Sequence, residues 1–244
     1  MRFFIISTRV FRQTVGDRRF FALSVVVPFV VIFLLKIFFD HLPQYPLKER
    51  YIVPLSAYVA HFFSFILALI SLVQERTRGT MERIFVSGVD KWELILGYLV
   101  GFLFMATVQT FAVAFSLIFV FHLSYTTGKF VLLTFIIWIL AIVSVALGLF
   151  ISAFAHSESH VFPFIPLVSI PSFFFSGLLV DFGDLPLWAQ WIGLLYPFHY
   201  AVNALLEMIR SNPDFQYIWM NIALLTVYTV ILIIVSSRTL RDVV

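Results

Sequence analysis

Residues 130–155 read FVLLTFIIWILAIVSVALGLFISAFA and include no charged side chain. A helix needs about 20 apolar residues to cross the ~30 Å hydrocarbon core of a bilayer, so this stretch is predicted to span a membrane. The whole chain of 244 residues agrees, because 61% of it is hydrophobic and only 12% is charged. Soluble domains carry about 25% charged residues. The composition therefore excludes an ordinary soluble enzyme and a disordered chain, and the lack of cysteine excludes disulfides and thiol chemistry.

Long runs without Asp, Glu, Lys or Arg also lie on both sides of this stretch. We therefore expect an all-α integral membrane protein, with a single transmembrane domain over residues 1–244 and six spanning helices. Residues 185–209 are expected to form a re-entrant helix hairpin instead, because Pro186 and Pro197 divide them into helices too short to span. The predicted spans cover approximately residues 20–39, 52–73, 93–121, 130–155, 161–180 and 216–236.

Positive charge predicts the orientation of these spans. Most of the 16 Lys and Arg side chains fall in the N-terminal leader, the loop 74–93 and the C-terminal tail, which six spans place on one side. Lys and Arg favour the cytosolic side, so both termini and this loop are predicted to be cytosolic. In the leader, residues 1–19, Arg9 and Arg12 share one helical arc while Val10 and Phe11 fall opposite. That pattern predicts an amphipathic helix on the membrane surface.

Small side chains recur at helical spacing in three of the spans. Such stripes let helix backbones approach closely in lipid, so they favour helix packing over a substrate site. The span at 161–180 differs because Pro163, Pro166 and Pro171 interrupt it. Broken helices are tolerated where they line a water-filled path, which makes this span the first candidate for a transport route. The stripes are Ala57, His61, Ser64, Ala68 and Ser71; Gly97 and Gly101; and Ser144, Gly148 and Ser152.

The chain lacks the patterns of several chemistries. It contains no GxxxxGK[ST] sequence and so no P-loop for nucleotide phosphates. His156 and His160 could share a helix face, but Glu158 would point away, so a polar turn is favoured and no metal site is expected. An ion-coupled carrier needs a titratable group deep in the bilayer, and His61 is the strongest such group. An energy source for transport would therefore lie outside this chain.

The loop 74–93 is where such a source could attach. Gly79 breaks the preceding helix, and Thr80 can cap a short new helix at 80–87. Its apolar face would meet either lipid headgroups or a groove in a partner. That face carries Met81, Ile84 and Phe85.

Sequence signals also predict where this short helix ends and the next one begins. Ser87 and Gly88 are predicted to stop it. Asp90, followed three residues later by Glu93, resembles a capping box that opens the third span.

Three stretches resemble the membrane subunits of type 2 ABC exporters, now often called type V. Residues 75–83, ERTRGTMER, are similar to the ER-x-x-GT-x-E signature before the third span of that family. Residues 175–180, FSGLLV, resemble the fifth-span exit of the eukaryotic G-subfamily half-transporters. Residues 185–205 resemble the re-entrant helix pair before the sixth span. The leader with Asp17-Arg18-Arg19 is similar to the bacterial drug-exporter branch.

The resemblance implies an ABC transporter permease that pairs with a second copy and with two copies of a separate nucleotide-binding ATPase subunit. ATP and Mg would bind that partner, so this chain itself is expected to be no enzyme and to hold no cofactor. It would contact membrane lipid and no nucleic acid, in a bacterial or archaeal cytoplasmic membrane. It would export an amphipathic drug- or lipid-like substrate from the cytosol or inner leaflet by alternating access.

The resemblance also implies roles for particular residues. The short helix would be the coupling helix seated on the ATPase, and Leu178 with Leu179 would form a hydrophobic plug at the exit. The substrate pathway would run between two copies along the second and fifth spans, with His61, Ser64, Phe65, Phe173, Phe174 and Phe175 as candidates. The coupling residues would be Glu75, Arg78, Thr80, Met81, Glu82, Arg83, Ile84 and Phe85.

Other interpretations stay open at this point. An ion-coupled secondary transporter would use His61, and a membrane scaffold would move nothing. Polysaccharide, sodium and haem-export permeases share the same scaffold, and no pattern identifies the substrate. The sequence also leaves open whether the partner permease is identical and whether a second docking point exists at 156–160, which lacks basic residues.

Overall fold

The computed structural model describes residues 3–41, 48–155 and 157–239, and the regular structure of that part of the chain is entirely helical. The prediction of an all-α protein is confirmed for these residues. The helices are α1 (Phe3–Gly16), α2 (Arg18–Asp40), α3 (Lys48–Thr77), α4 (Thr80–Val86), α5 (Lys91–Phe119), α6 (Thr127–Ser152), α7 (Glu158–Phe174), α8 (Leu187–Leu194), α9 (Pro197–Ile209) and α10 (Phe215–Thr239), with a short 3-10 helix, η1 (Phe182–Asp184).

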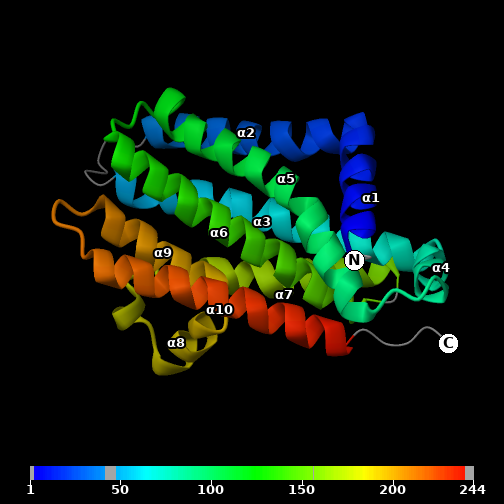
Figure 1. Cartoon of the computed structure of the whole chain (residues 1–244). Helices are drawn as coiled ribbons and strands as arrows, with labels where there is room; N and C mark the ends of the chain where they lie inside the picture. Colours follow the sequence, from blue (N-terminus) through cyan, green and yellow to red (C-terminus); the bar gives the residue numbers. More distant parts are fainter. Residues whose placement is uncertain (1–2, 42–47, 156, 240–244) are drawn as a thin grey trace.

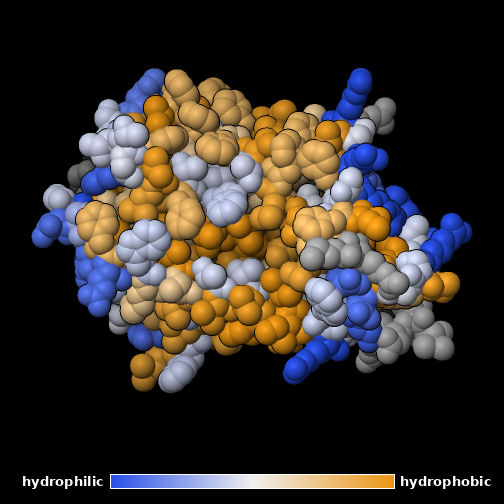
Figure 2. Space-filling model, viewed as in Figure 1, coloured by the Kyte–Doolittle hydropathy of each residue, from blue (hydrophilic) through white to orange (hydrophobic). Residues whose placement is uncertain are grey.

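Several helices are long and apolar enough to cross a bilayer. Four pass this test in the described residues: Glu49–Thr77, Lys91–Phe119, Thr127–Ser152 and Phe215–Thr239. The pair α8 and α9 passes only when taken together, and the two helices meet at a bend of 96°. The bend lies at Pro197, the first residue of α9, where a ring replaces the amide that would continue α8. Figure 2 shows the apolar surface as a broad band between two hydrophilic ends.

The two ends of the bundle carry different elements (Figure 1). The short helix α4 and the helix α1 lie at one end, together with the last turn of α10. The turns that join α5 to α6 and α9 to α10 lie at the other end. The loop 74–93 and the N-terminal helix are therefore on the same side of the apolar band.

Helices α3 and α6 form the centre of the bundle, and the small-residue stripes of the two helices meet each other. A Cβ atom on Gly148 would lie 2.4 Å from the backbone oxygen of Phe65 and 3.0 Å from Cβ of Ala68. His61 and Ser144 are hydrogen-bonded across the same interface, with Nδ1 2.7 Å from Oγ. The prediction that these stripes serve helix packing is confirmed, because only small side chains allow this approach.

The glycine pair of α5 packs against the N-terminal helix. A Cβ atom on Gly97 would lie 2.6 Å from Cβ of Ile6, and one on Gly101 would lie 2.6 Å from Cβ of Val10. Helix α1 therefore buries a stripe on α5 while Phe4 and Ile5 stay exposed. Val10, expected on the lipid-facing arc, contacts protein instead, because the glycines leave a groove that fits its branched side chain.

Helix α7 runs unbroken through Pro163, Pro166 and Pro171. The predicted interruption of this span is therefore wrong. Neighbouring helices and local adjustments can satisfy the backbone groups that proline leaves free, so proline is tolerated within membrane helices.

Candidate functional site

Glycines at both ends of helix α4 adopt left-handed backbone conformations. Gly79 precedes it with φ 68°, in the left-handed region that suits glycine, and it is the N-cap. Gly88 follows it with φ 79°. The capping box of Asp90 and Glu93 is present, and the amide of Asp90 donates to Oε2 of Glu93 over 3.3 Å. The predicted stop at Ser87-Gly88 and the predicted capping box are both confirmed.

The expected cap at Thr80 is wrong, because the reversal already occurs at Gly79 and Thr80 falls in the first helical turn. Its hydroxyl turns back to α3 instead. Oγ1 of Thr80 donates to the backbone oxygen of Glu75 over 2.9 Å and to the Glu75 carboxylate. The side chain thus ties α4 to the helix before it.

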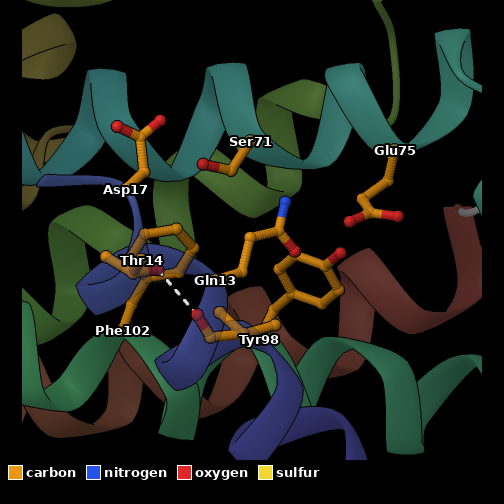
Figure 3. Close-up of a pocket in the computed structure, with 8 residues that line it drawn as sticks. Gln13, Thr14, Asp17, Ser71, Glu75, Tyr98 and Phe102 are labelled. Atoms are coloured by element: carbon orange, nitrogen blue, oxygen red, sulfur yellow. Dashed lines mark hydrogen bonds between the residues drawn. The ribbon is translucent and has the colours of Figure 1, made fainter. Parts of the chain in front are cut away.

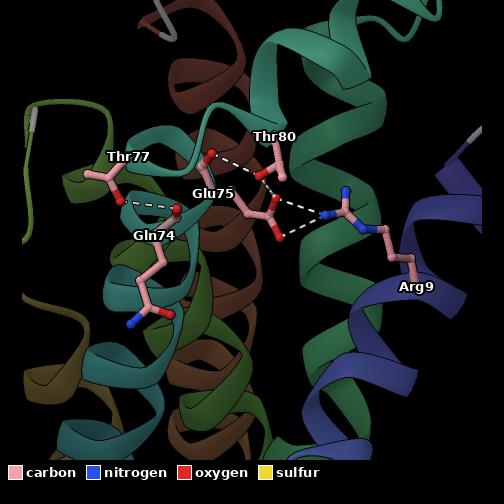
Figure 4. A network of polar contacts seen from close by, with 5 residues as sticks. All are labelled: Arg9, Gln74, Glu75, Thr77 and Thr80. Atoms are coloured by element: carbon pink, nitrogen blue, oxygen red, sulfur yellow. Dashed lines mark hydrogen bonds and ion pairs between the residues drawn. The ribbon is translucent and has the colours of Figure 1, made fainter.

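Glu75 is the centre of a polar junction between α1, α3 and α4 (Figure 4). Nη2 of Arg9 donates to Oε1 over 3.1 Å and to Oε2 over 2.9 Å, while Thr80 donates from the other side. Glu75 is only 5% exposed, so its carboxylate depends on these donors. Glu75 and Thr80, both expected to contact a partner subunit, are therefore bonded within the chain, and the sequence pattern does not identify Arg9 as their neighbour.

A second basic side chain, Arg76, joins α3 to α6 at the same end. Its Nη1 donates to the backbone oxygens of Ser152 over 3.1 Å and of Ala155 over 2.6 Å. Ser152 is the last residue of α6, where the carbonyls lack intrahelical donors and carry the negative end of the helix dipole, and Ala155 lies just after that helix end. Arg76 therefore fixes the end of α6 relative to α4.

Helix α4 exposes less apolar surface than the sequence predicted. Met81 is buried, whereas Ile84 and Phe85 are half-buried, so the apolar face packs partly on the bundle. Arg78 and Arg83 are exposed, and so is Val86, which is 89% exposed and was not among the candidates. The side chain of Glu82 lies outside the described residues. A partner at this end would meet two arginines and an exposed valine.

A small polar pocket lies behind the junction, between α1, α3 and α5 (Figure 3). Its volume is about 60 Å³, room for on the order of two water molecules at ~30 Å³ each. That is too small for a drug-like substrate. Its walls are Val10, Gln13, Thr14, Asp17, Ser71, Glu75, Tyr98 and Phe102.

Three of the candidate pathway residues lie in the packed interior. His61 is 1% exposed, with Ser144 at Nδ1 and the hydroxyl of Ser172 3.2 Å from Nε2. Ser64 donates to Oε1 of Gln109 over 2.9 Å. Phe65 is 1% exposed. In a single copy of the chain, these side chains face neighbouring helices and line none of the pockets that we describe.

An open apolar groove lies on the adjacent face of α3, against α2 and α7. Its volume is about 500 Å³. Phe173 borders it through an edge contact with Tyr58, the ring centres being 5.0 Å apart, and Phe174 is 51% exposed. Phe175 packs on Trp188 instead. None of the residues that line the groove was among the sequence candidates, because the small-residue stripe follows a different face of the helix. The lining residues are Val31, Tyr58, Val59, Phe62, Phe63, Ile165, Pro166, Ser169 and Ile170.

The two leucines of the expected plug differ in their surroundings. Leu178 is fully buried, whereas Leu179 is 39% exposed. Gly177 turns the chain before them with φ 92°. Nδ1 of His199 donates to the backbone oxygen of Ser176 over 2.9 Å, which attaches this turn to α9.

An ion pair links the same region to the start of α3. Arg50 and Asp181 are bonded through their side chains, which are 31% and 64% exposed. The turn after α7 is thus held from both sides, by His199 and by Arg50.

In the part of the chain that the structure describes, no three His, Asp or Glu side chains converge. His156 and the side chain of Glu158 lie outside the described residues.

Comparison with known proteins adds the family. Residues 1–209 match the model of the ABC-2 type transporter family. The chain is 26% identical to ABC transporter G family member 20 of Dictyostelium discoideum over 71% of its own length and 24% of that protein. It is 23% identical to the probable multidrug ABC transporter permease YbhR of Escherichia coli over 73% of its length and 49% of that protein. It thus spans half or less of these relatives. The family match covers most of the chain, and the chain belongs to the ABC-2 type transporter family.

Proposed function

We propose that this chain is the membrane subunit of an ABC exporter, driven by a separate ATPase subunit that binds ATP and Mg. The observation that carries the proposal is the position of α4. It projects between two long apolar helices and is held to α1 and α3 through Glu75. A force on α4 would therefore act on the two helices that meet at that carboxylate, and not on a flexible loop.

In this proposal six helices span the membrane: α2, α3, α5, α6, α7 and α10. Helix α2 has 23 residues and α7 has 17, and both are apolar. The bent pair α8 and α9 would re-enter from the outer side. Both termini and α4 would then be cytosolic, with α1 on the inner surface. The basic side chains of α1 and of the α4 region support this orientation, because Lys and Arg favour the cytosolic side.

The proposed substrate is an amphipathic drug- or lipid-like molecule, and the groove of α3 and α7 supports this class. It is lined by aromatic and aliphatic side chains, with Tyr58 and Ser169 as its polar members. Two copies of the chain facing each other through these helices would enclose one shared pathway. Alternating access would require the turn at Leu178 and Leu179 to open when the ATPase subunits close. The name of YbhR as a probable multidrug permease agrees with this class.

Co-purification tests the first step of the proposal. The chain is isolated from its native host in mild detergent, and the eluate is examined for a soluble ATPase in equal amount. The proposal expects one such subunit, with ATP hydrolysis that rises when the permease is present. A chain that remains alone after crosslinking in membranes contradicts the proposal.

A charge reversal tests the contact surface. Arg83→Glu changes an exposed side chain of α4, so the chain should insert normally while stimulated ATP hydrolysis falls at least several-fold. Arg238→Glu makes the same change at an exposed position at the same end of the bundle and serves as the matched control. The double variant Glu82→Ala with Phe85→Ala should lower both transport and stimulated hydrolysis. Normal coupling in both α4 variants would remove α4 from the proposal.

A further inference from the structure

A shallow groove lies on the outward face of α1, on the side that does not pack against α5. Its volume is about 530 Å³. All of its side chains are exposed, and it shares none of them with the groove of α3 and α7. It therefore forms a separate candidate site, with cationic and apolar walls. These walls are Phe4, Ile5, Thr8, Arg9 and Arg12.

Helix α1 lies across the end of the bundle where α4 also lies, beside the edge of the apolar band (Figure 1, Figure 2). The buried stripe of α1 packs on Gly97 and Gly101 of α5, so the opposite side faces outward. An amphipathic helix at such an edge lies at the boundary between lipid headgroups and acyl chains. The groove is therefore at the depth where a membrane presents its phosphate groups.

The outward side of α1 has an apolar flank and a basic flank. Phe4, Phe11 and Val15 follow one another at helical spacing along the apolar flank, and all three are exposed. The ring of Phe11 meets that of Phe104 on α5 edge to face, with ring centres 5.0 Å apart. Phe104 is itself exposed, so this flank continues the apolar surface of the spanning helices. Arg9 lies on the opposite flank and reaches toward α3.

The groove runs between these flanks and contains cationic groups that the protein leaves free. Arg12 makes no hydrogen bond or ion pair to any residue that the structure describes. Arg9 uses only Nη2 for Glu75, as Figure 4 shows, and its side chain is 41% exposed. Thr8 lies one turn from Arg12, and its hydroxyl donates to the backbone oxygen of Phe4 over 2.8 Å. In the described part of the chain, Arg12 is thus a groove cation without a counter-charge.

Charge and shape together select one kind of occupant. Arginine binds phosphate through paired N–H bonds, and no acidic side chain lines the groove to compete. The exposed ring of Phe4 gives an acyl chain an apolar surface beside that phosphate. A zwitterionic lipid would also bring a positive ammonium group close to Arg12, whereas an anionic lipid would bring only the charge that Arg12 lacks. A free phosphate ion would leave the apolar wall uncovered.

We propose that the groove on α1 binds one anionic phospholipid of the inner leaflet. The lipid phosphate lies between Arg12 and the free edge of Arg9, and an acyl chain covers Phe4. A lipid held there steadies Arg9 from outside, so it reinforces the bond between Arg9 and Glu75. The site presupposes the proposed orientation, with α1 on the cytosolic surface, and in this respect rests on the proposed function. It requires no ATPase.

Photolabelling of the full chain in liposomes tests the site. Phosphatidylglycerol and phosphatidylcholine probes carry the same diazirine near the headgroup end of one acyl chain. Each probe is added at low concentration to phosphatidylcholine liposomes, and peptide mass spectrometry locates the label after illumination. Phosphatidylglycerol should label α1 at least about fivefold more than phosphatidylcholine does. Both probes should label the exposed Val227 and Ile231 of α10 equally.

Two variants within the groove and one outside it test the role of charge. Arg12→Gln removes the charge from an exposed side chain, so the preference for phosphatidylglycerol should fall about fivefold, which corresponds to ~1 kcal/mol for one arginine near an anionic surface. Thr8→Glu places a carboxylate between the arginines and should abolish the preference from a second exposed position. Arg238→Gln is the matched control, because Arg238 is exposed in the last turn of α10 and lies outside the groove. Arg9 stays unchanged because it holds Glu75.

The outcomes separate this site from the proposed function. Equal labelling of α1 by the two lipids, or a preference that survives both groove variants, overturns the site and leaves the exporter proposal standing. A preference that disappears when inorganic phosphate is added at constant ionic strength overturns it too, because the groove would then bind a free anion. Absence of label on α1 from either lipid contradicts the proposed orientation as well as the site.

Discussion

Arg9 reaches from α1 to Glu75 on α3 and donates to both oxygens of that carboxylate. The two residues lie 66 positions apart in the sequence, yet they join the N-terminal helix to the start of α4. The pair is unequal, because the side chain of Arg9 is 41% exposed and that of Glu75 is 6% exposed. The difference in burial predicts that substitutions at Arg9 and Glu75 change the stability of the protein by different amounts.

Removing Arg9 should destabilise the protein more than removing the charge of Glu75. Arg9→Ala leaves a buried carboxylate without its charged partner, and the loss should stay below the about 3–5 kcal/mol that breaking a fully buried pair costs, because Arg9 is partly exposed. Glu75→Gln leaves a guanidinium that water can reach, so we expect less than half of that loss. Thermal unfolding in detergent measures both. Arg12→Ala, at an exposed position on the same helix, is the control and should change little; an equal loss in all three variants would argue against the junction.

The glycine pair of α5 should be intolerant to a single methyl group. Gly97→Ala would bring Cβ within 2.6 Å of Ile6, and overpacking of this kind costs about 1–3 kcal/mol. The added group should lift α1 and expose it to protease. Ile6→Ala in the same chain should restore the packing in part. Gly128→Ala, with no atom near its added Cβ, should leave α1 protected; protease sensitivity there instead would show a general effect of substitution.

His61 distinguishes the exporter from an ion-coupled carrier. Its two ring nitrogens are already bonded to Ser144 and Ser172 within the packed core, so we expect a packing role. His61→Asn should lower the unfolding temperature yet leave transport, per folded molecule, dependent on ATP. Transport that stops in the variant, and that collapses when the proton gradient is removed from the wild type, would favour the carrier.

The ion pair of Arg50 and Asp181 should matter for opening more than for stability. Both side chains are partly exposed, and exposed pairs contribute about 0–1 kcal/mol. Asp181→Asn should therefore shift the unfolding temperature little but increase leakage of a small dye from liposomes, because the turn at Leu178 loses one of its two attachments. The exchange Arg50→Asp with Asp181→Arg should restore the seal. A tight seal in the single variant would show that His199 alone holds the turn.

The sequence predicted helix boundaries correctly where their physical cause lies within a few residues. Gly79 and the pair of Asp90 and Glu93 bound α4 through backbone conformation and capping, and neither depends on distant residues. The prolines of α7 and α9 differ in their effect on the helix. Pro197 marks a real bend between α8 and α9, whereas the prolines of α7 do not break it, since the surrounding helices decide whether a missing amide can be tolerated.

The sequence by itself determined that the chain is helical and apolar enough for a membrane, and that a short amphipathic helix separates two long ones. It did so because hydrocarbon thickness, charge and helix caps act along a single segment. Only the tertiary structure decided which surfaces meet. Small residues such as Gly97 and Gly148 predict close helix packing but not which helix packs there. The burial of Glu75 likewise follows only from the contact that the fold makes with Arg9. Contacts of this kind depend on the positions of several helices at once, which no single segment specifies.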